Sequence, residues 1–147
     1  MHKNSAMKKI VLLSLLLLLS AACSSDDDAA ANAACENDVI IDNALYTSVE
    51  TSHYLVSEAK IVGDCLEVSI RSGGCSGEDW VAELVDADRV AETATLQRDL
   101  KVSLENPEEC FGIVTRSFSF NLRPLQSQDK ELILNLENWE EPLNYEY

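Results

Sequence analysis

The sequence predicts an all-β fold: a single antiparallel, immunoglobulin-like β-sandwich of about seven to eight strands over residues 35–147. Apolar and polar residues alternate along many short segments, as they do in strands that bury one face. Turn residues separate these segments at the roughly 8–12-residue spacing of sandwiches. The 113 residues of this range (147 − 34) are about one domain's worth, and the range contains no internal repeat.

The chain begins with a segment that has the features of a signal peptide. Three lysines precede an apolar run at residues 10–19, and the small residues 20–22 lead into Cys23. A membrane-spanning helix needs roughly 20 apolar residues, whereas a run of about 10–14 is typical of a signal peptide. Residues 1–22 are therefore expected to be a leader that is removed during export.

The residues before Cys23 resemble the lipobox of bacterial lipoproteins. The resemblance implies that the Cys23 sulfur carries a covalent lipid and that Cys23 becomes the mature N-terminus, with no other cofactor. Ser20 departs from the pattern, because a large aliphatic residue usually stands three positions before the cysteine and Leu19 lies one step further back. The alternative is an ordinary signal peptide cut near Ala22, which would release a soluble secreted protein.

Residues 23–34 contain no large apolar side chain and are expected to form a disordered acidic tether. Ser24 follows the lipidated cysteine where an aspartate would resemble an inner-membrane retention signal. The run Ser25-Asp26-Asp27-Asp28 resembles the signals that export lipoproteins of Bacteroidota to the cell surface. We therefore expect an outer-membrane protein that faces the cell surface. The alternatives are the periplasmic face and a run that is only a solvated linker.

The mature chain is strongly acidic. All 26 acidic residues follow residue 22 and three of the 11 basic residues precede it, so the formal charge after cleavage is 8 − 26 = −18. A surface of this sign repels phosphate, so DNA and RNA are not expected as partners.

The clearest strand is predicted at residues 65–72, between turn residues at 63–64 and 73–74. Weaker strands are expected at residues 39–46, 55–62 and 143–147, and residues 86–95 are expected to be a loop. The inward-facing sets of the strong strands are Leu66, Val68 and Ile70; Trp80, Ala82 and Leu84; Leu100, Val102 and Leu104; Phe118, Phe120 and Leu122; and Leu132, Leu134 and Leu136.

Four cysteines remain beside Cys23, and outside the cytoplasm they are expected to form two disulfides. If Cys65 begins a strand and Cys75 follows its far end, they lie more than about 20 Å apart, too far to bond. If each strand crosses the sandwich once, in alternating direction, Cys35 and Cys65 share one end and Cys75 and Cys110 the other. The predicted bonds are therefore Cys35–Cys65 and Cys75–Cys110, and the alternative of a zinc site is disfavoured by the cysteine spacing.

Several short motifs also carry a family resemblance. Ser-Gly-Gly-Cys at 72–75 is followed by Trp80, then by Cys110, by the alternating Phe118 and Phe120, and by Leu-Arg-Pro-Leu at 122–125. Residues 60–136 thereby resemble the C-terminal β-sandwich of NigD-like lipoproteins of Bacteroidota. The resemblance implies a surface-lipoprotein context and a Cys75–Cys110 bond, but it brings no catalytic residue to this chain.

Residues 73–77 read Gly-Gly-Cys-Ser-Gly, the cysteine form of a nucleophile elbow. As a nucleophile, Cys75 would need a general base, usually a histidine that follows it in the chain. No histidine follows Cys75, and His53, the one histidine of the mature chain, is expected to be an exposed loop residue. A disulfide-bonded turn is therefore favoured over a nucleophile.

Acidic residues are paired in several predicted loops, where they could bind calcium or act as an acid and a base. The pairs are Glu78/Asp79, Asp86/Asp88, Glu108/Glu109 and Glu140/Glu141. None follows the EF-hand pattern, since Val90 occupies the third ligand position and no glycine follows Arg89. Charged loop tips without a metal are therefore favoured.

The remaining aromatic residues are expected to pack rather than to form a binding patch. Trp80 alternates with two apolar residues, and Tyr145 and Tyr147 alternate as a last strand would; Trp139 lies just before them.

Two functions remain open. The favoured one is a non-catalytic binding or structural module that a lipid anchors to the membrane, with an unidentified protein or glycan as its partner. The alternative is a small envelope hydrolase that uses loop carboxylates, with or without calcium.

Overall fold

The computed structural model describes residues 34–91 and 94–147. The predicted leader, the lipidation site Cys23 and the acidic run that includes Ser24, Ser25, Asp26, Asp27 and Asp28 lie outside the described residues. No helix within the described ranges is long and apolar enough to span a membrane.

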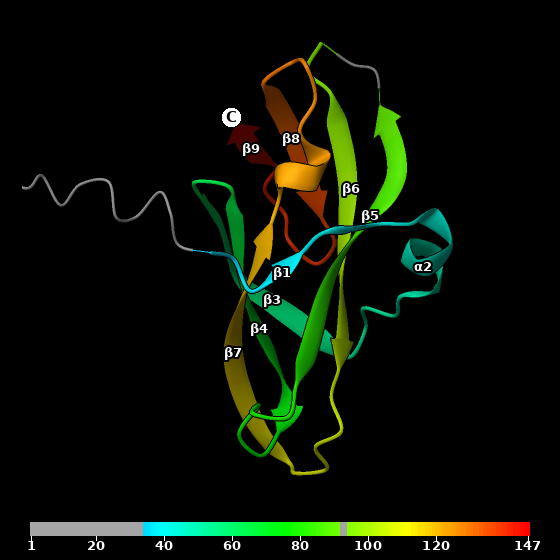
Figure 1. Cartoon of the computed structure of the whole chain (residues 1–147). Helices are drawn as coiled ribbons and strands as arrows, with labels where there is room; N and C mark the ends of the chain where they lie inside the picture. Colours follow the sequence, from blue (N-terminus) through cyan, green and yellow to red (C-terminus); the bar gives the residue numbers. More distant parts are fainter. Residues whose placement is uncertain (1–33, 92–93) are drawn as a thin grey trace, which may run out of the picture.

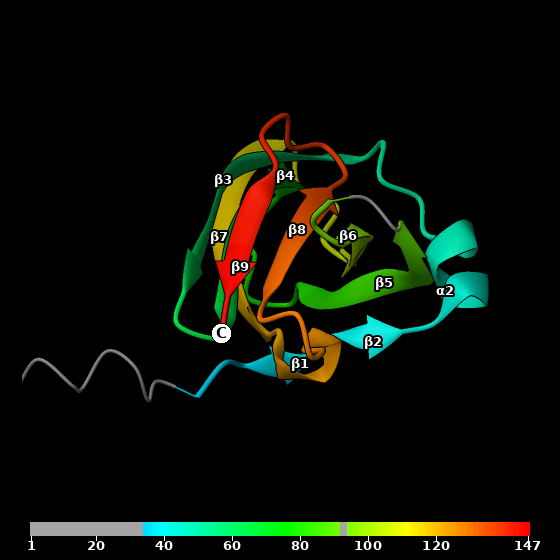
Figure 2. The same cartoon turned by 90° about the horizontal axis from the view of Figure 1, so that it is seen from above.

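The described residues form a β-sandwich of two sheets that face each other (Figures 1 and 2). One sheet has the strand order β1-β7-β4-β3 and the other β2-β5-β6-β8-β9, which confirms the predicted all-β class. The strands are β1 (Asn37–Asp38), β2 (Ile40–Ile41), β3 (Tyr54–Val62), β4 (Cys65–Gly74), β5 (Val81–Ala91), β6 (Gln97–Glu105), β7 (Gly112–Asn121), β8 (Glu131–Leu136) and β9 (Leu143–Glu146).

The hydrophobic core lies between the sheets, and the predicted inward-facing sets of β4 to β8 are all buried in it. Tyr145 on β9 is also fully buried, and Trp139 and Tyr147 pack against the core. Trp80 is 2% exposed, so its predicted place in the core is confirmed.

Three of the ladders are parallel, so the sandwich is mixed where an antiparallel one was predicted. β1 pairs in parallel with β7, β2 with β5, and β6 with β8. Alternation reports which residues face the core, but parallel and antiparallel strands share it. The directions depend instead on where the chain changes sheet, as it does from β1 to β2, and from β7 to β8 through the 3-10 turn η2 (Arg123–Leu125).

The strand predicted at residues 39–46 is also wrong. After β2 the chain enters helix α2 (Asn43–Ser48) instead of continuing as a strand. Asp42 makes the change, because its side chain accepts a hydrogen bond of 2.9 Å from the N–H of Leu45 and so caps the helix.

The chain nevertheless travels from one end of the sandwich to the other between Cys35 and Tyr54. β1 lies beside the last residues of β7, whereas Tyr54 pairs with Ser72 near the far end of β4. The alternation of ends that predicted the disulfides is therefore kept, although no single strand makes this passage.

β5 continues into the segment that was predicted to be a loop at 86–95. An irregularity between Asp86 and Val90 interrupts its ladder with β6, and the pairing resumes up to Ala91. Asp88 has a φ of 51°, a left-handed conformation that aspartate tolerates better than most residues. The loop prediction was therefore wrong for residues 86–91, because the irregularity interrupts the alternation of apolar and polar residues that marks a strand.

Candidate functional site

One disulfide lies at each end of strand β4. Cys35 is bonded to Cys65 with 5.6 Å between their Cα atoms, and Cys75 to Cys110 with 5.0 Å. Both predicted pairings are confirmed. The ten residues of β4 separate the two bonds, a distance of about 30 Å at roughly 3.3 Å per residue. In the disulfide, Cys75 has no thiol to act as a nucleophile.

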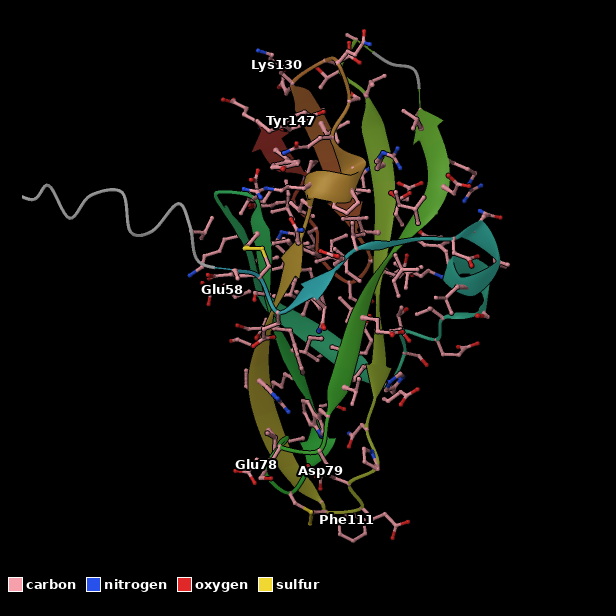
Figure 3. All side chains as sticks on the ribbon, in the orientation of Figure 1. Glu58, Glu78, Asp79, Phe111, Lys130 and Tyr147 are labelled. Atoms are coloured by element: carbon pink, nitrogen blue, oxygen red, sulfur yellow. A yellow bond between two sulfur atoms is a disulfide. The ribbon has the colours of Figure 1, made fainter. Side chains whose placement is uncertain are left out.

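The Cys75–Cys110 end is the candidate functional site. We call residues 73–81 and 105–113 the disulfide tip. Figure 3 shows Glu78, Asp79 and Phe111 of the tip at one end of the molecule, and Lys130 and Tyr147 at the opposite end.

A carboxylate joins the two segments of the tip. Glu108 accepts hydrogen bonds from the backbone N–H groups of Cys75 (2.6 Å), Ser76 (3.2 Å) and Gly77 (2.9 Å). The Ser76 hydroxyl donates a further bond of 3.2 Å to the same carboxylate. Asn106 adds a bond of 2.7 Å from its side-chain amide to the carbonyl of Gly73. The 105–110 segment is therefore fixed by hydrogen bonds as well as by the disulfide.

Two of the three glycines of the motif shape this cradle: Gly74 makes room for the carboxylate, and Gly77 allows the turn. A Cβ on Gly74 would lie 2.5 Å from Glu108 Oε2 and 3.0 Å from the Trp80 ring. Gly77 has a φ of +75°, which strongly favours glycine. The Gly-Gly-Cys-Ser-Gly segment is thus a cradle for an internal carboxylate rather than a nucleophile elbow.

The cradle stabilises the ionised form of Glu108. Desolvation alone raises the pKa of this carboxyl, but the hydrogen bonds from Gly77, Cys75 and Ser76 together outweigh it. The pKa of Glu108 therefore lies below its ordinary value of 4.5.

The loop at 77–80 is fixed from β7. One guanidinium nitrogen of Arg116 donates hydrogen bonds to the carbonyl oxygens of Gly77, Glu78 (2.9 Å) and Trp80 (3.1 Å). The guanidinium also lies 5.0 Å from the centre of the Phe118 ring. The guanidinium group of Arg116 is therefore bound by contacts within the molecule.

Phe111 stands at the apex of the tip and is fully exposed, at 105% of its reference area. Cys110 before it is held by the disulfide, and Gly112 after it begins β7. Ile113 (64% exposed) and Val81 (54%) add apolar surface to the tip. The exposed carboxylates of the tip are those of Glu78, Asp79, Glu105 and Glu109. The sequence of the tip contains no lysine or arginine.

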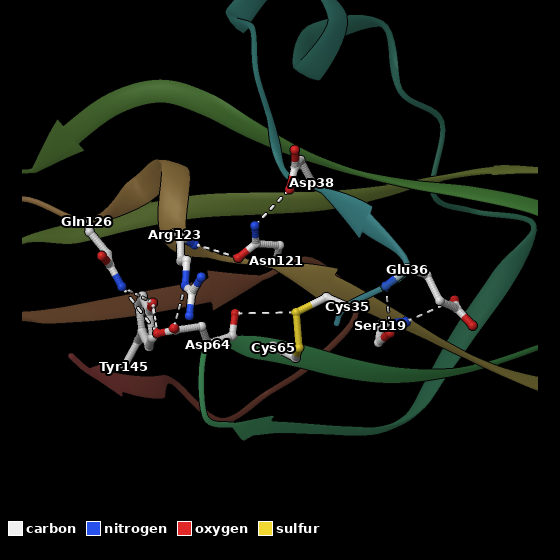
Figure 4. The surroundings of a disulfide bond; sticks show 10 residues. All are labelled: Cys35, Glu36, Asp38, Asp64, Cys65, Ser119, Asn121, Arg123, Gln126 and Tyr145. Carbon is white, nitrogen blue, oxygen red and sulfur yellow. Dashed lines mark hydrogen bonds and ion pairs between the residues drawn. A yellow bond between two sulfur atoms is a disulfide. The ribbon is translucent and has the colours of Figure 1, made fainter. Parts of the chain in front are cut away.

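The opposite end carries a network of polar side chains around Asp64 (Figure 4). Arg123 Nε donates to Asp64 Oδ2 and the Tyr145 hydroxyl donates to Oδ1, both at 2.7 Å. These hydrogen bonds hold the pKa of Asp64 below its ordinary value, with that from Arg123 the larger cause. The network ties η2 and β9 to the turn that precedes Cys65.

The other candidate residues lie apart from one another. His53 is exposed, with Nε2 3.1 Å from the carbonyl oxygen of Leu104. Asp86 is fully buried on β5 and paired with Arg98 at 2.7 Å, whereas Asp88 beside it is exposed.

The acidic pairs do not meet at one point. Glu78/Asp79 and Glu108/Glu109 lie in the tip, whereas Asp86/Asp88 lie on β5 and Glu140/Glu141 just before β9. Among residues 34–91 and 94–147, no three His, Cys, Asp or Glu side chains are grouped so that they could hold a metal ion.

A shallow hollow lies on the outer face of the four-stranded sheet. Serine hydroxyls and three carboxylates line it, with the Lys60 ammonium 3.0 Å from Glu67. The sequence did not indicate this hollow, because its residues come from β3, β4, β7 and the segment before β1.

No family model and no curated protein matches the chain. Among solved structures, the chain is similar to a crystal structure of a protein of unknown function, DUF1344, from Bacteroides vulgatus ATCC 8482. The TM-score is 0.50 and the sequence identity 18%, over 76% of this chain and 56% of the other. The chain thus spans just over half the length of that protein. The likeness concerns the fold.

Proposed function

We propose that this chain is a lipoprotein that Cys23 anchors to the bacterial outer membrane, facing the cell surface, and that it binds a partner protein through the disulfide tip without catalysing a reaction. The leader, the lipobox and the acidic run support the anchor, and the motifs around Cys75 support kinship with NigD-like lipoproteins of Bacteroidota. The observation that carries the binding role is the fully exposed Phe111 on a segment fixed by the Cys75–Cys110 bond and by Glu108.

An exposed phenylalanine on a rigid loop is suited to binding. Burying a Phe side chain contributes roughly 1.5–3 kcal/mol, and aromatic residues are prominent among the residues that dominate interfaces. A segment that is already fixed loses little conformational freedom on binding. Phe111 can therefore act as an anchor residue that inserts into a pocket of the partner.

The position of the tip agrees with display away from a membrane. The tether joins the domain at Cys35, at the end of β4 remote from the tip. Twelve residues from Cys23 to Ala34 span at most roughly 40 Å. Anchored at Cys23, the domain would thus carry Phe111 about 30 Å beyond the point where the tether ends.

Cross-linking on intact cells tests this role. A photo-reactive residue replaces Phe111, or Lys130 as the matched control, since both are exposed and lie at opposite ends (Figure 3). We expect a discrete protein adduct from position 111 and none from position 130. Adducts only from position 130 would contradict binding through the tip. Turnover of a peptide or glycan by the purified protein, abolished by Glu78→Ala/Asp79→Ala, would favour the hydrolase.

A further inference from the structure

Strand β7 has an unprotected edge beside the disulfide tip. It pairs with β4 along its whole length, but with β1 only at Phe120 and Asn121. Within the described parts of the chain, no strand lies beside the stretch from Ile113 to Ser117 on the side away from β4. We call this vacant position the β7 lane.

The backbone groups that face the lane can be identified from the bonds next to it. The carbonyl oxygens of Ser119 and Asn121 accept hydrogen bonds from Glu36 and Val39, each at 3.1 Å. Since backbone groups of alternate residues point to the same side of a strand, the other odd-numbered residues of β7 also face away from β4. Ile113, Thr115 and Ser117 thus direct three N–H and three C=O groups into the lane. No hydrogen bond from any residue of 34–91 or 94–147 reaches them.

The first disulfide lies beside the paired end of β7. Cys35 directly precedes Glu36, which lies beside Ser119 on the lane side of β7. The Cys35 sulfur is bonded to Cys65, which pairs with Asn121 from the β4 side. The bond therefore holds Cys35 close to β4.

The opposite edge of the same sheet, strand β3, is protected against pairing, whereas this edge is not. β3 has an irregularity between Val56 and Glu58 and carries an exposed Lys60, both of which are devices that discourage strand pairing. Between Ile113 and Ser117 the register with β4 is continuous, and the outward side chains are those of Ile, Thr and Ser. No bulge, proline or outward charge protects the lane.

The surroundings of the lane indicate what would fill it. Ile113 and Phe111 offer apolar contact at the tip end. The exposed Glu78 and Asp79 belong to the loop that packs against β7, since a Cβ on Gly77 would lie 3.1 Å from Val114. Arg71, which is exposed and pairs with Thr115 from β4, is outnumbered by the four exposed carboxylates of the tip, so the occupant should carry apolar side chains together with lysine or arginine. A second copy, since the full chain has a formal charge of −15, and an anionic membrane are both disfavoured by charge.

We propose that the β7 lane accepts an extended, basic and apolar segment of the partner protein by strand addition, with Phe111 docking beside it. Main-chain hydrogen bonds to Ile113, Thr115 and Ser117 supply the pairing, and the side chains of the tip select the segment. This inference rests on the proposed binding at the disulfide tip and identifies the chemistry of its partner.

A displayed library of random 12-residue peptides provides the probe. The library is selected for binding to the chain from residue 23 onward, which carries Cys23→Ser to omit the lipid and has both disulfides formed. Peptides that also bind the Phe111→Ser variant are removed. We expect enriched peptides that combine Lys or Arg with aliphatic or aromatic residues. An enriched peptide is then synthesised with N-methyl groups at every second backbone nitrogen, in two versions of opposite parity. In strand addition one version loses at least about tenfold in affinity and the other changes by less than about threefold.

The Thr115→Pro variant tests the same bonds from the protein side. Its missing N–H faces the lane and not β4, so the fold should be retained while peptide affinity falls by about tenfold, with Thr115→Ala as the matched control. If Thr115→Pro does not fold, the methylation series on the unsubstituted chain decides.

Equal effects of the two methylated versions would overturn strand addition. The proposed role of the tip would then stand alone, because the enriched peptides are selected for their dependence on Phe111. Failure to enrich any peptide over Phe111→Ser would overturn both, and enrichment of acidic peptides would overturn the charge argument.

Discussion

Glu108 links the two segments of the disulfide tip through its ionised carboxylate, and its contribution should depend on pH. Its pKa in the folded protein lies below the ordinary value of 4.5. A depressed pKa contributes stability that is fully present above about 4.5 and is lost as the pH falls towards the folded-state value. We expect Glu108→Gln to be less stable than the wild type near neutral pH, and the difference to shrink near about pH 3 in urea titrations. A difference that stayed constant with pH would contradict this role.

Asp86 depends on a single charged partner. The carboxyl is fully buried, and Arg98 is its ion-pair partner. Burial raises the pKa of Asp86 although the N–H of Asp88 and the guanidinium of Arg98 favour the carboxylate. Removing one member of a buried ion pair typically lowers the free energy of unfolding by about 3–5 kcal/mol. In Arg98→Met the Asp86 carboxylate can take up a proton, so the loss should lie near about 3 kcal/mol. Urea unfolding measures this, and the exposed Arg89→Met is the control. Equal stability of the two variants would argue against the pair.

Single residues were predictable where a local pattern determines their place. Trp80 alternates with buried neighbours, and the four cysteines follow from the order of the strands. The environment of Glu108 could not be predicted, because its donors lie 31 to 33 residues away in another loop. The sequence did contain a signal for this cradle, namely Gly74, Ser76 and Gly77, but the same residues also resemble a nucleophile elbow.

The Cys75–Cys110 disulfide should both stabilise the fold and hold Phe111 in place. A loop of about 35 residues corresponds to roughly 3–4 kcal/mol in the chain-entropy model. We expect Cys75→Ser/Cys110→Ser to lose about this much stability in urea and to show faster amide exchange at Phe111 and Gly112. The control Cys35→Ser/Cys65→Ser removes a bond that closes a loop of similar length, and it should lose similar stability without faster exchange at the tip. Faster exchange in both double variants would contradict a local role.

The long strands could be predicted because six to eleven residues allow alternation to be counted. β1 and β2 have two residues each, too few for a period, and the helix between them and β3 depends on one capping residue. The parallel ladders depend on which strands become neighbours after a change of sheet. That choice is made by packing of the whole core.

For the whole molecule, lipid attachment should depend on one sulfur. Acyl chains bury many CH₂ groups at about 0.8 kcal/mol each, so a doubly or triply acylated Cys23 would hold the domain at the membrane. We expect Cys23→Ser to take up no radiolabelled fatty acid in growing cells. The control is the double variant Cys75→Ser/Cys110→Ser, which should remain labelled. Label in Cys23→Ser would show that another residue is acylated.

If the disulfide tip presents Phe111 to a protein partner, the dissociation constant of the partner that is cross-linked at position 111 should depend on this side chain. The constant would be measured for the wild type, for Phe111→Ser and for Val62→Ser, which alters an exposed apolar residue at the end of β3, beside Cys65 and remote from the tip. An interface anchor contributes about 2 kcal/mol or more, so Phe111→Ser should weaken binding by roughly 30-fold. Val62→Ser should change it by less than about threefold. Equal dissociation constants for the wild type and Phe111→Ser would contradict the claim.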